Sequence, residues 1–418
     1  MRRSRSSAAE SLVSGAVAIQ YRSPSADEGI ASALGTTYRA FGGEIRDYDR
    51  EHLPKLMPVD RIHCAFDSGH PIGTTAAYPF DITIPGGQLP MGGVTWVGVL
   101  PSHRRRGVMT ELMRRQLRDL HERGEPLAGL WASESAIYGR FGYGLAAPIA
   151  AMRAETARFR FRGDPPPEGA VRLVDRDEAA QIFPQVYERV RPTLPGMLTR
   201  TPERWNTYRL ADEEFMRDGA GPKFYALYER EAVPEAYALY RVKSNWEGGL
   251  PRGQVNIIET VAAGPVGARE LWRFLFSIDL VATVDSDLDL ASPLFLLVAD
   301  PRRLQLKITD GLWLRLVDVE AALRARSYAD GDSVVLEVTD DFCSWNTGRY
   351  RVGEVVERTD DEPDIRLDVV DLASAYLGAF AFERLADALR VDELREGALA
   401  RTTALFRTPR PPFCPEVF

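Results

Sequence analysis

The residues with the clearest chemical potential form a short basic loop, in which Arg104–Arg106 are followed by Gly107. A predicted strand, Gly93–Val99, precedes the loop, and a predicted helix, Val108–Arg123, follows it. The first turn of a helix presents unpaired N–H groups and a partial positive charge, which together bind anions. Glycine lets the backbone approach a bulky ligand, and arginine can bind phosphate oxygens through paired N–H groups. The sequence therefore predicts a site for a phosphate-bearing ligand, with a solvated basic helix start as the alternative.

The spacing of this loop differs from the two common phosphate-binding motifs. The P-loop requires Lys-Ser/Thr after its glycine, and the dinucleotide fingerprint requires G-x-G-x-x-G; the loop fits neither. Its start, Arg104 to Gly107, matches the Arg/Gln-x-x-Gly-x-Gly/Ala pattern with which GNAT acyltransferases bind the pyrophosphate of acetyl-CoA. Met109 occupies the second glycine position of that pattern, which is a departure from it.

A second motif follows the next predicted strand, Leu127–Ala132. Residues 133–144 read Ser-Glu-Ser-Ala-Ile-Tyr-Gly-Arg-Phe-Gly-Tyr-Gly, and this run closely resembles the Eis (enhanced intracellular survival) acetyltransferases of actinobacteria. The HRRRG loop at His103–Gly107, the chain length and the terminal Phe418 are similar to that family too. The resemblance spans the whole chain and is strongest over residues 91–148 and at the terminus.

The resemblance implies an N-acetyltransferase with specific roles for residues of both motifs. Tyr138 falls at the position of the family's general acid, and the C-terminal carboxylate of Phe418 at that of its general base. The two flanking strands would splay apart, and the backbone of the first would pair with the pantetheine arm of acetyl-CoA. The residues implied in acetyl-CoA binding are Val97, Gly98, Val99, Arg104, Arg105, Arg106, Gly107, Val108, Met109, Thr110, Ser133 and Glu134.

Elementary acid–base chemistry fits both implied roles. A phenol has a pKa of roughly 10 and a thiol of roughly 8.5, so a tyrosine can protonate a departing thiolate. The alternative for Tyr138 is packing against Phe141 and Tyr143, and Tyr143 is the second candidate for the acid. Residues 411–418 are apolar and rich in proline, whereas most chain ends are polar and frayed. A docked end would hold the Phe418 carboxylate at a defined point, where it acts through a water or with a pKa tuned by burial.

The substrate class implied by the resemblance is a primary amine on a cationic molecule, such as an aminoglycoside or a lysine side chain. We expect Trp96 to contact this substrate, and Tyr38 or Phe41 to form further walls of the cleft. Family members assemble as hexamers, so a homohexamer is expected. A protein N-terminal or lysine acetyltransferase is a second enzyme hypothesis. The alternative from another class is a non-catalytic oligomeric protein that binds lipid or another ligand, but a degenerate enzyme would tend to lose these motifs.

The elements that must position these residues predict an α/β (α+β) chain with two GNAT-like mixed-sheet domains in tandem and a third domain resembling sterol carrier proteins. The predicted divisions are a disordered tail at 1–14, an acetyl-CoA-binding GNAT domain at 15–160, a degenerate second GNAT domain at 161–290 and the third domain at 291–418. The loop Ala262–Gly267 of the second domain carries no basic residue, and Pro265 lacks an N–H group, so we expect it to bind no acetyl-CoA.

Periodicity and turn residues predict the individual elements. In the first domain we expect strands at 16–21, 61–66 and 72–84 and a helix at 25–35, besides the elements named above. In the third domain we expect strands at 294–298, 304–308, 312–317, 333–338 and 348–352 and a helix at 370–380.

The composition of the chain argues against several other functional classes. The chain has 418 residues with 52 Lys+Arg and 60 Asp+Glu, and its net charge of -8 argues against a general nucleic-acid binder. Its apolar runs are shorter than the ~18 residues of a membrane span, and its N-terminus does not fit a signal peptide. The three cysteines and five histidines show no metal-ligand or disulfide spacing, so we expect no metal and a cytoplasmic location.

Overall fold

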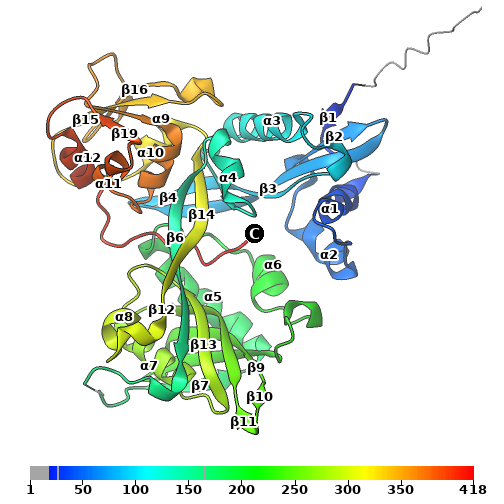
Figure 1. Ribbon diagram of the computed structural model, residues 1–418, viewed down its shortest axis with the longest axis vertical. Helices are drawn as coiled ribbons and strands as arrows, with labels where there is room; N and C mark the ends of the chain where they lie inside the picture. Colours follow the sequence, from blue (N-terminus) through cyan, green and yellow to red (C-terminus); the bar gives the residue numbers. More distant parts are fainter. Residues whose placement is uncertain (1–17, 26–27, 164) are drawn as a thin grey trace, which may run out of the picture.

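The computed structural model in Figure 1 describes residues 18–25, 28–163 and 165–418. Within these residues the chain forms two units that share one large mixed sheet, followed by a unit with a sheet of its own. The mixed α/β architecture predicted from the sequence is confirmed. The tail predicted at 1–14 lies outside the described residues.

The first unit contains the strands and helices that flank the basic loop. Its predicted helix at 25–35 lies later in the chain, as α1, although Ser25 and Glu28 exchange hydrogen bonds of 2.7 and 3.3 Å as in a capping box. The part of the predicted strand 16–21 that is described forms the start of β1. The elements are β1 (Gln20–Arg22), α1 (Gly29–Ala40), α2 (Asp47–His52), β2 (Ile62–Asp67), β3 (His70–Ile84), β4 (Gly87–Val99), α3 (Val108–Glu122), β5 (Leu127–Trp131), α4 (Ser135–Tyr138) and β6 (Gly144–Glu155).

Helix α3 confirms the prediction from apolar spacing. Leu112, Met113, Leu117 and Leu120 are all buried on one face, against β3 and β4. Gly124 ends the helix with φ +71, and the next N–H group bonds to the carbonyl of Leu120 at 2.9 Å. The helix therefore holds its first turn, and the loop before it, rigidly at the end of β4.

The second unit repeats the outline of the first. It follows the proline-rich segment at 162–169, and its loop-to-helix step again comes directly after a central strand, β12. Its elements are β7 (Ala170–Val174), α5 (Arg176–Val190), α6 (Pro202–Arg204), the π-helical turn η7 (Trp205–Arg209), β8 (Lys223–Arg230), β9 (Val233–Lys243), β10 (Trp246–Glu247), β11 (Leu250–Pro251), β12 (Gly253–Ala262), α7 (Pro265–Phe276), β13 (Val281–Leu288), α8 (Leu294–Leu297) and β14 (Lys307–Leu316).

One continuous sheet joins these two units, with the strand order β1-β2-β3-β4-β5-β14-β6-β13-β12-β9-β8-β7. Strands β6 and β13 pair antiparallel from Glu155 with Thr283 to Ala150 with Leu288. The long strands β6 and β14 therefore run from one unit toward the other, as Figure 1 shows.

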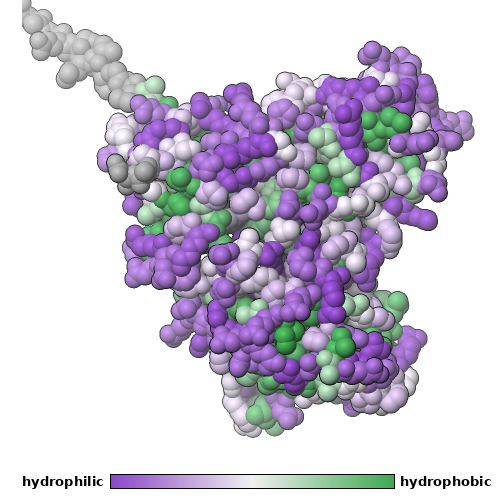
Figure 2. All heavy atoms as spheres, turned by 180° about the vertical axis from the view of Figure 1, so that it is seen from behind, coloured by the Kyte–Doolittle hydropathy of each residue, from purple (hydrophilic) through white to green (hydrophobic). Residues whose placement is uncertain are grey.

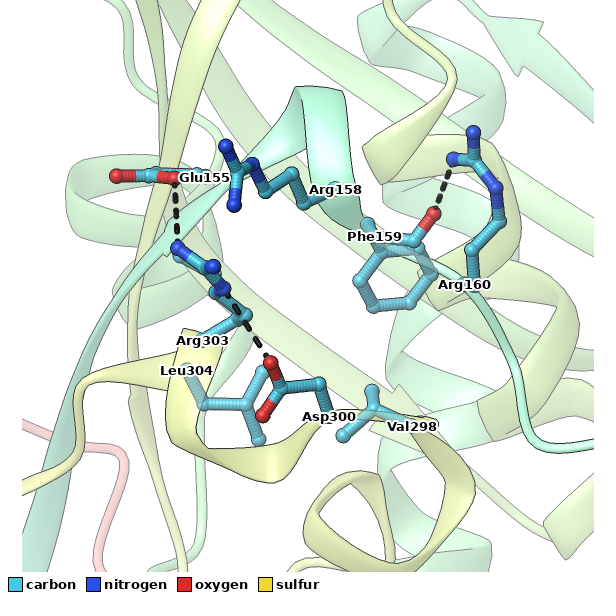
Figure 3. Close-up of a pocket in the computed structure, with 9 residues that line it drawn as sticks. Glu155, Arg158, Phe159, Arg160, Val298, Asp300, Arg303 and Leu304 are labelled. Carbon is cyan, nitrogen blue, oxygen red and sulfur yellow. Dashed lines mark hydrogen bonds and ion pairs between the residues drawn. The ribbon is translucent and has the colours of Figure 1, made fainter.

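Two predictions for the segment 294–317 are wrong. The apolar run at 294–298 forms helix α8 instead of a strand, because a short apolar run does not distinguish the two by its period. The expected strands at 304–308 and 312–317 form the single strand β14, which is interrupted by a bulge and lies between β5 and β6 in the large sheet. Figure 3 shows how this segment is fixed to the end of β6, through ion pairs of Arg303 with Glu155 at 3.5 Å and with Asp300 at 3.3 Å.

The third unit has a five-stranded sheet of order β17-β16-β15-β18-β19. The helix expected at 370–380 is α10, which packs against β6 and β14 and so attaches this unit to the large sheet. Its elements are α9 (Val319–Ala325), β15 (Val334–Thr339), β16 (Gly348–Val352), β17 (Glu357–Arg358), β18 (Ile365–Asp368), α10 (Val369–Tyr376), α11 (Phe382–Asp387), β19 (Val391–Glu393) and α12 (Ala398–Phe406).

The surface agrees with the charged composition of the chain. Figure 2 shows that hydrophilic residues cover most of one face, with small apolar patches between them. The last segment, after α12, leaves the third unit and ends in the middle of the molecule, between the two units of the large sheet (Figure 1). The chain end therefore meets the large sheet near the centre of the molecule.

Candidate active site

A fork opens in the large sheet between β4 and β5. The two strands pair in parallel only from Met91 with Leu127 to Gly93 with Gly129. Strand β4 continues to Val99 along β3, and its register shifts near Trp96, whose φ is +53. This splay confirms the expectation from the sequence. Beyond Gly93, the edge of β4 that faces the fork pairs with no strand among the described residues, so its N–H and C=O groups can bind an extended ligand.

The basic loop lies at the far end of this fork. Arg105 and Gly107 both have left-handed backbone, with φ +61 and +77, and α3 begins at Val108. Left-handed residues of this kind can turn neighbouring N–H groups toward one side, and the positive end of α3 lies next to them. The side chains of Arg104–Arg106 are exposed, and that of Arg106 lies 3.8 Å from Asp67.

The residues expected to contact acetyl-CoA converge on the fork and loop. Val97, Gly98 and Val99 are buried at the end of β4, and a Cβ atom on Gly98 would lie 3.1 Å from the Cβ of Ala40. Glycine at this position therefore lets α1 pack closely against β4. Val108 is buried, and Met109 and Thr110 are half-buried in the first turn of α3. Ser133 and Glu134 are exposed between β5 and α4.

Tyr138 ends the short helix α4 and is 5% exposed. Its ring packs edge-on against Tyr143, with centroids 6.0 Å apart, in the core beneath α3. Burial raises the pKa of Tyr138 above its usual value of about 10, Ser133 lowers it through a hydrogen bond, and the charge of Glu134 raises it. The hydroxyl therefore keeps its proton at neutral pH, as a general acid must.

Tyr143, the second candidate acid, has a different environment. Its side chain is fully buried, and its hydroxyl has no hydrogen-bond partner among the described residues. Burial raises its pKa far above the usual range. A group enclosed in this way contacts core residues rather than a ligand.

Phe418 lies where β4 and β5 begin to separate. Its ring centroid is 5.1 Å from that of Phe80 on β3, and a Cβ atom on Gly93 would lie 3.2 Å from the ring. The indole N–H of Trp131, the last residue of β5, donates to the carbonyl of Glu416 at 2.7 Å. The chain end is therefore docked at the fork, and it packs with a different core from the one that holds Tyr138.

The expected cleft walls lie on the β4 side of the fork. Trp96 is half-buried, and its ring lies 6.0 Å from that of Tyr78. Phe41, after α1, is 63% exposed beside Gly98. Tyr38 donates its hydroxyl to Asp49 at 2.6 Å, so this tyrosine is tied to α2.

Sequence reasoning missed a buried charge cluster next to the chain end. Arg200, Arg204 and Arg209 surround the carboxylate of Glu416, and Glu259 on β12 joins them. One signal was available: Glu416 is the single charged residue in the apolar terminus 411–418. The spacing of the arginines gave no such sign, because they belong to another unit of the chain.

Two further features of the described part of the chain bear on function. Its His, Cys, Asp and Glu side chains form no group of three that could hold a metal ion. None of its helices is both long and apolar enough to cross a membrane.

Comparison with known proteins agrees with this geometry. The sequence profile of an acetyltransferase (GNAT) domain matches residues 20–146, and a second acetyltransferase (GNAT) domain profile matches residues 196–316. A sterol carrier protein domain profile matches residues 319–415. The forked sheet, the loop before α3 and these matches define an N-acetyltransferase with two GNAT domains in tandem, and the GNAT fold implies the use of acetyl-CoA.

Full-length relatives specify the family. An uncharacterized N-acetyltransferase of Streptomyces avermitilis is 42% identical over 92% of this chain and 96% of its own. The N-acetyltransferase Eis of Mycobacterium tuberculosis is 34% identical over 85% of this chain and 89% of its own. The crystal structure of Eis1 from Mycobacterium abscessus superposes with a TM-score of 0.84, covering 96% of this chain and all of that one, at 34% identity. The chain belongs to the Eis family of N-acetyltransferases.

Proposed function

We propose that the protein transfers the acetyl group of acetyl-CoA to a primary amine of a cationic substrate, such as an aminoglycoside or a lysine side chain. The observation that carries this proposal is the docking of Phe418 at the fork between β4 and β5. Tyr138 ends the helix α4 that follows β5, and this tyrosine is the proposed acid. A homohexamer in the cytoplasm is part of the same proposal.

The fork and loop suit acetyl-CoA in shape and charge. The free edge of β4 near Val97 and Val99 would bind the pantetheine arm as an added strand. The N–H groups of Gly107–Thr110 would hold the pyrophosphate, and Arg104–Arg106 add charge in exposed positions that phosphate can reach. Ser133 and Glu134 border the opening on the β5 side.

The carboxylate of Phe418 is the proposed base. An amine attacks the thioester carbonyl only when it is neutral, so a proton must leave the ammonium group before transfer. The carboxylate takes this proton directly or through a water, and its negative charge attracts the cation. Trp96 and Phe41 would contact the rest of the substrate.

Tyr138 is the proposed acid. When the new C–N bond forms and the C–S bond breaks, the sulfur leaves as a thiolate. The Tyr138 hydroxyl gives its proton to this sulfur. The nitrogen then loses its second proton to the Phe418 carboxylate, which has already released the first ammonium proton to solvent. The products are an amide, a thiol and one proton released to solvent, and the second proton returns from Phe418 to Tyr138 through solvent.

The direct test is acetyl-CoA-dependent thiol release against a panel of amines that includes aminoglycosides and lysine peptides. The proposal expects turnover with cationic primary amines, and acetylated products identified by mass spectrometry. Absence of thiol release with every amine, in protein that binds acetyl-CoA, would favour a non-catalytic ligand-binding protein instead.

A further inference from the structure

The second GNAT domain has a fork of its own. Its central strands β12 and β13 pair in parallel only from Gly253 with Val281 to Asn256 with Asp285. The register of β12 against β9 then shifts between Ile257 and Glu259. These features repeat the splay and the irregular β4 strand of the first domain. The second fork therefore has the form of an acyl-CoA groove without a basic loop.

The C-terminal segment lies against this second fork. Cys414, Pro415 and Val417 line a cavity of about 710 Å³ together with the end of β12 and the start of α7. The N–H of Phe413 donates to the carbonyl of Pro195 at 2.9 Å, and the carbonyl of Phe413 lies 2.9 Å from where a Cβ atom on Gly196 would be. Gly196 has φ +96, so its lack of a side chain admits the segment.

Charge fixes the segment at one point, Glu416. Its carboxylate lies 2.7 Å from the Nε of Arg200, 2.5 Å from the Nε of Arg204 and 2.9 Å from an Nη of Arg209. The side chains of Arg200 and Glu416 are 0% and 1% exposed. Arg200 also holds Glu259 at 2.5 Å, directly after the register shift of β12.

The local backbone explains how two of these arginines reach one carboxylate. Residues 205–209 form a π-helical turn, in which the N–H of Leu210 bonds to the carbonyl of Trp205 at 2.8 Å. A π turn aligns residues five apart, so Arg204 and Arg209 face the same way, whereas an α-helix would separate them. Such turns are rare and are frequent at functional sites.

The cluster also contacts the ring that supports the chain end. The guanidinium of Arg204 lies 4.6 Å from the centroid of Phe80, and Phe80 packs against Phe418. Glu416 is therefore tied to Phe418 along the backbone and through Arg204 and Phe80.

From this arrangement we infer that the second GNAT domain acts as a receptor for the chain end, with Arg200, Arg204 and Arg209 gripping Glu416 so that the Phe418 carboxylate is held at the active-site fork. Glu416 is a positioning residue, since it reaches the reaction only through Phe418. The inference rests on the proposed role of the Phe418 carboxylate as base.

The test is Glu416→Gln, which keeps the shape of the side chain and removes its charge. We expect kcat/KM for a lysine-like amine to fall by roughly tenfold or more near pH 7, with the ~10²–10⁴-fold that a general base supplies as the upper limit. We expect the loss to shrink toward the amine pKa of roughly 10.4, where the substrate is already neutral. Acetyl-CoA affinity should be unchanged, because the loop and α3 do not contact Glu416.

The matched control is Glu270→Gln on α7. Glu270 is also buried and held by two arginines, Arg269 and Arg273, but it does not contact the C-terminal segment. Assayed well below its melting temperature, this variant should keep the pH dependence of the wild type. If both variants lose activity equally and without pH dependence, the loss is one of stability and the inference is wrong.

A third variant separates this inference from the proposed function. One glycine added after Phe418 displaces the terminal carboxylate and leaves Glu416 intact. Full turnover of the extended protein would contradict the proposed base itself. Impaired turnover of the extended protein with normal turnover of Glu416→Gln would contradict only the positioning role. If the Phe418 carboxylate is the base and Glu416 positions it, the losses of turnover from the two changes should be non-additive when combined, because both changes disable the same group.

Discussion

At the residue scale, two tyrosines five positions apart have different surroundings, which decide whether the hydroxyl can reach a ligand. Tyr138 lies next to exposed residues at the end of β5, whereas the Tyr143 hydroxyl is enclosed in the core. Both have a raised pKa because both are buried. The proton of Tyr138 is thus retained at neutral pH, as the proposed role of general acid requires.

We expect Tyr138→Phe to lower turnover by about 10²- to 10⁴-fold, the usual contribution of an acid–base group, with little change in acetyl-CoA affinity. The change removes a proton and almost no volume. Steady-state kinetics and calorimetric titration with acetyl-CoA measure the two effects.

The control for this variant is Tyr143→Phe, which should leave turnover close to that of the wild type. Normal turnover of Tyr138→Phe, or a larger loss in Tyr143→Phe, would assign the acid to Tyr143 or to solvent.

At the scale of elements, β4, the basic loop and α3 form one rigid unit. The amphipathic face of α3 is buried against the sheet, so the first turn cannot move without loss of core contacts. The left-handed residues Arg105 and Gly107 set the direction of the N–H groups in the loop. Affinity for the pyrophosphate should therefore depend on backbone direction as well as on charge.

We expect Arg105→Glu to weaken acetyl-CoA binding by about tenfold, or ~1.4 kcal/mol, because it reverses a charge beside the pyrophosphate. Arg118→Glu is the matched control, since Arg118 is exposed on α3, away from the loop that contains Arg105. Calorimetry on both variants checks the prediction. Equal affinity of the Arg105→Glu and Arg118→Glu variants for acetyl-CoA would show that the loop is not part of the binding site.

At the scale of the whole molecule, the proposed active site brings together residues of all three units. The C-terminal segment leaves the third unit and ends in the middle of the molecule in Figure 1. Arg200 of the second unit pairs with its Glu416 side chain, and Trp131 of the first unit donates to the Glu416 carbonyl beside the fork. The second unit is thereby joined to the C-terminal segment by ionic contacts, and to the first unit by the shared sheet.

We expect a C-terminal tag to impair turnover, because it removes the carboxylate from Phe418, while the same tag at the N-terminus should have no such effect. Melting temperature is measured beside activity. A C-terminally tagged protein with normal melting and full turnover would exclude the carboxylate as base. Substitution of the Phe418 side chain alone should lower turnover less than the tag does, since the terminal carboxylate remains.

The stability that the docked chain end contributes should depend on pH. Burial raises the pKa of the Glu416 carboxyl, but the charges of Arg200, Arg209 and Arg204 outweigh it and hold the pKa well below its usual range. A carboxyl with a lowered pKa in the folded state contributes stability above its unfolded pKa of roughly 4.3, and loses it as pH falls through the folded value. Wild type should therefore melt above Glu416→Gln at neutral pH, and the difference should narrow below about pH 4. A constant difference would contradict this linkage.

The local parts of the site can be predicted from residues that are close together in the chain. The basic loop, the start of α3, the fork strands and Tyr138 belong to one stretch of about fifty residues, where apolar period, glycine and turn residues act on near neighbours. The motifs in this stretch also indicated the family. Short apolar runs carry less information: the run at 294–298 predicts a strand, but its residues 294–297 form helix α8.

The position of the chain end, and the residues that bind it, follow from the complete fold and from no local pattern. Glu416 is more than 200 residues from its three arginines, and opposite charges that far apart have no preferred pairing in one dimension. The π turn next to Arg204 and the carboxylate that Arg204 and Arg209 share likewise come together only in the folded chain. A buried ion pair is favourable only when every partner is in place, which requires the complete fold.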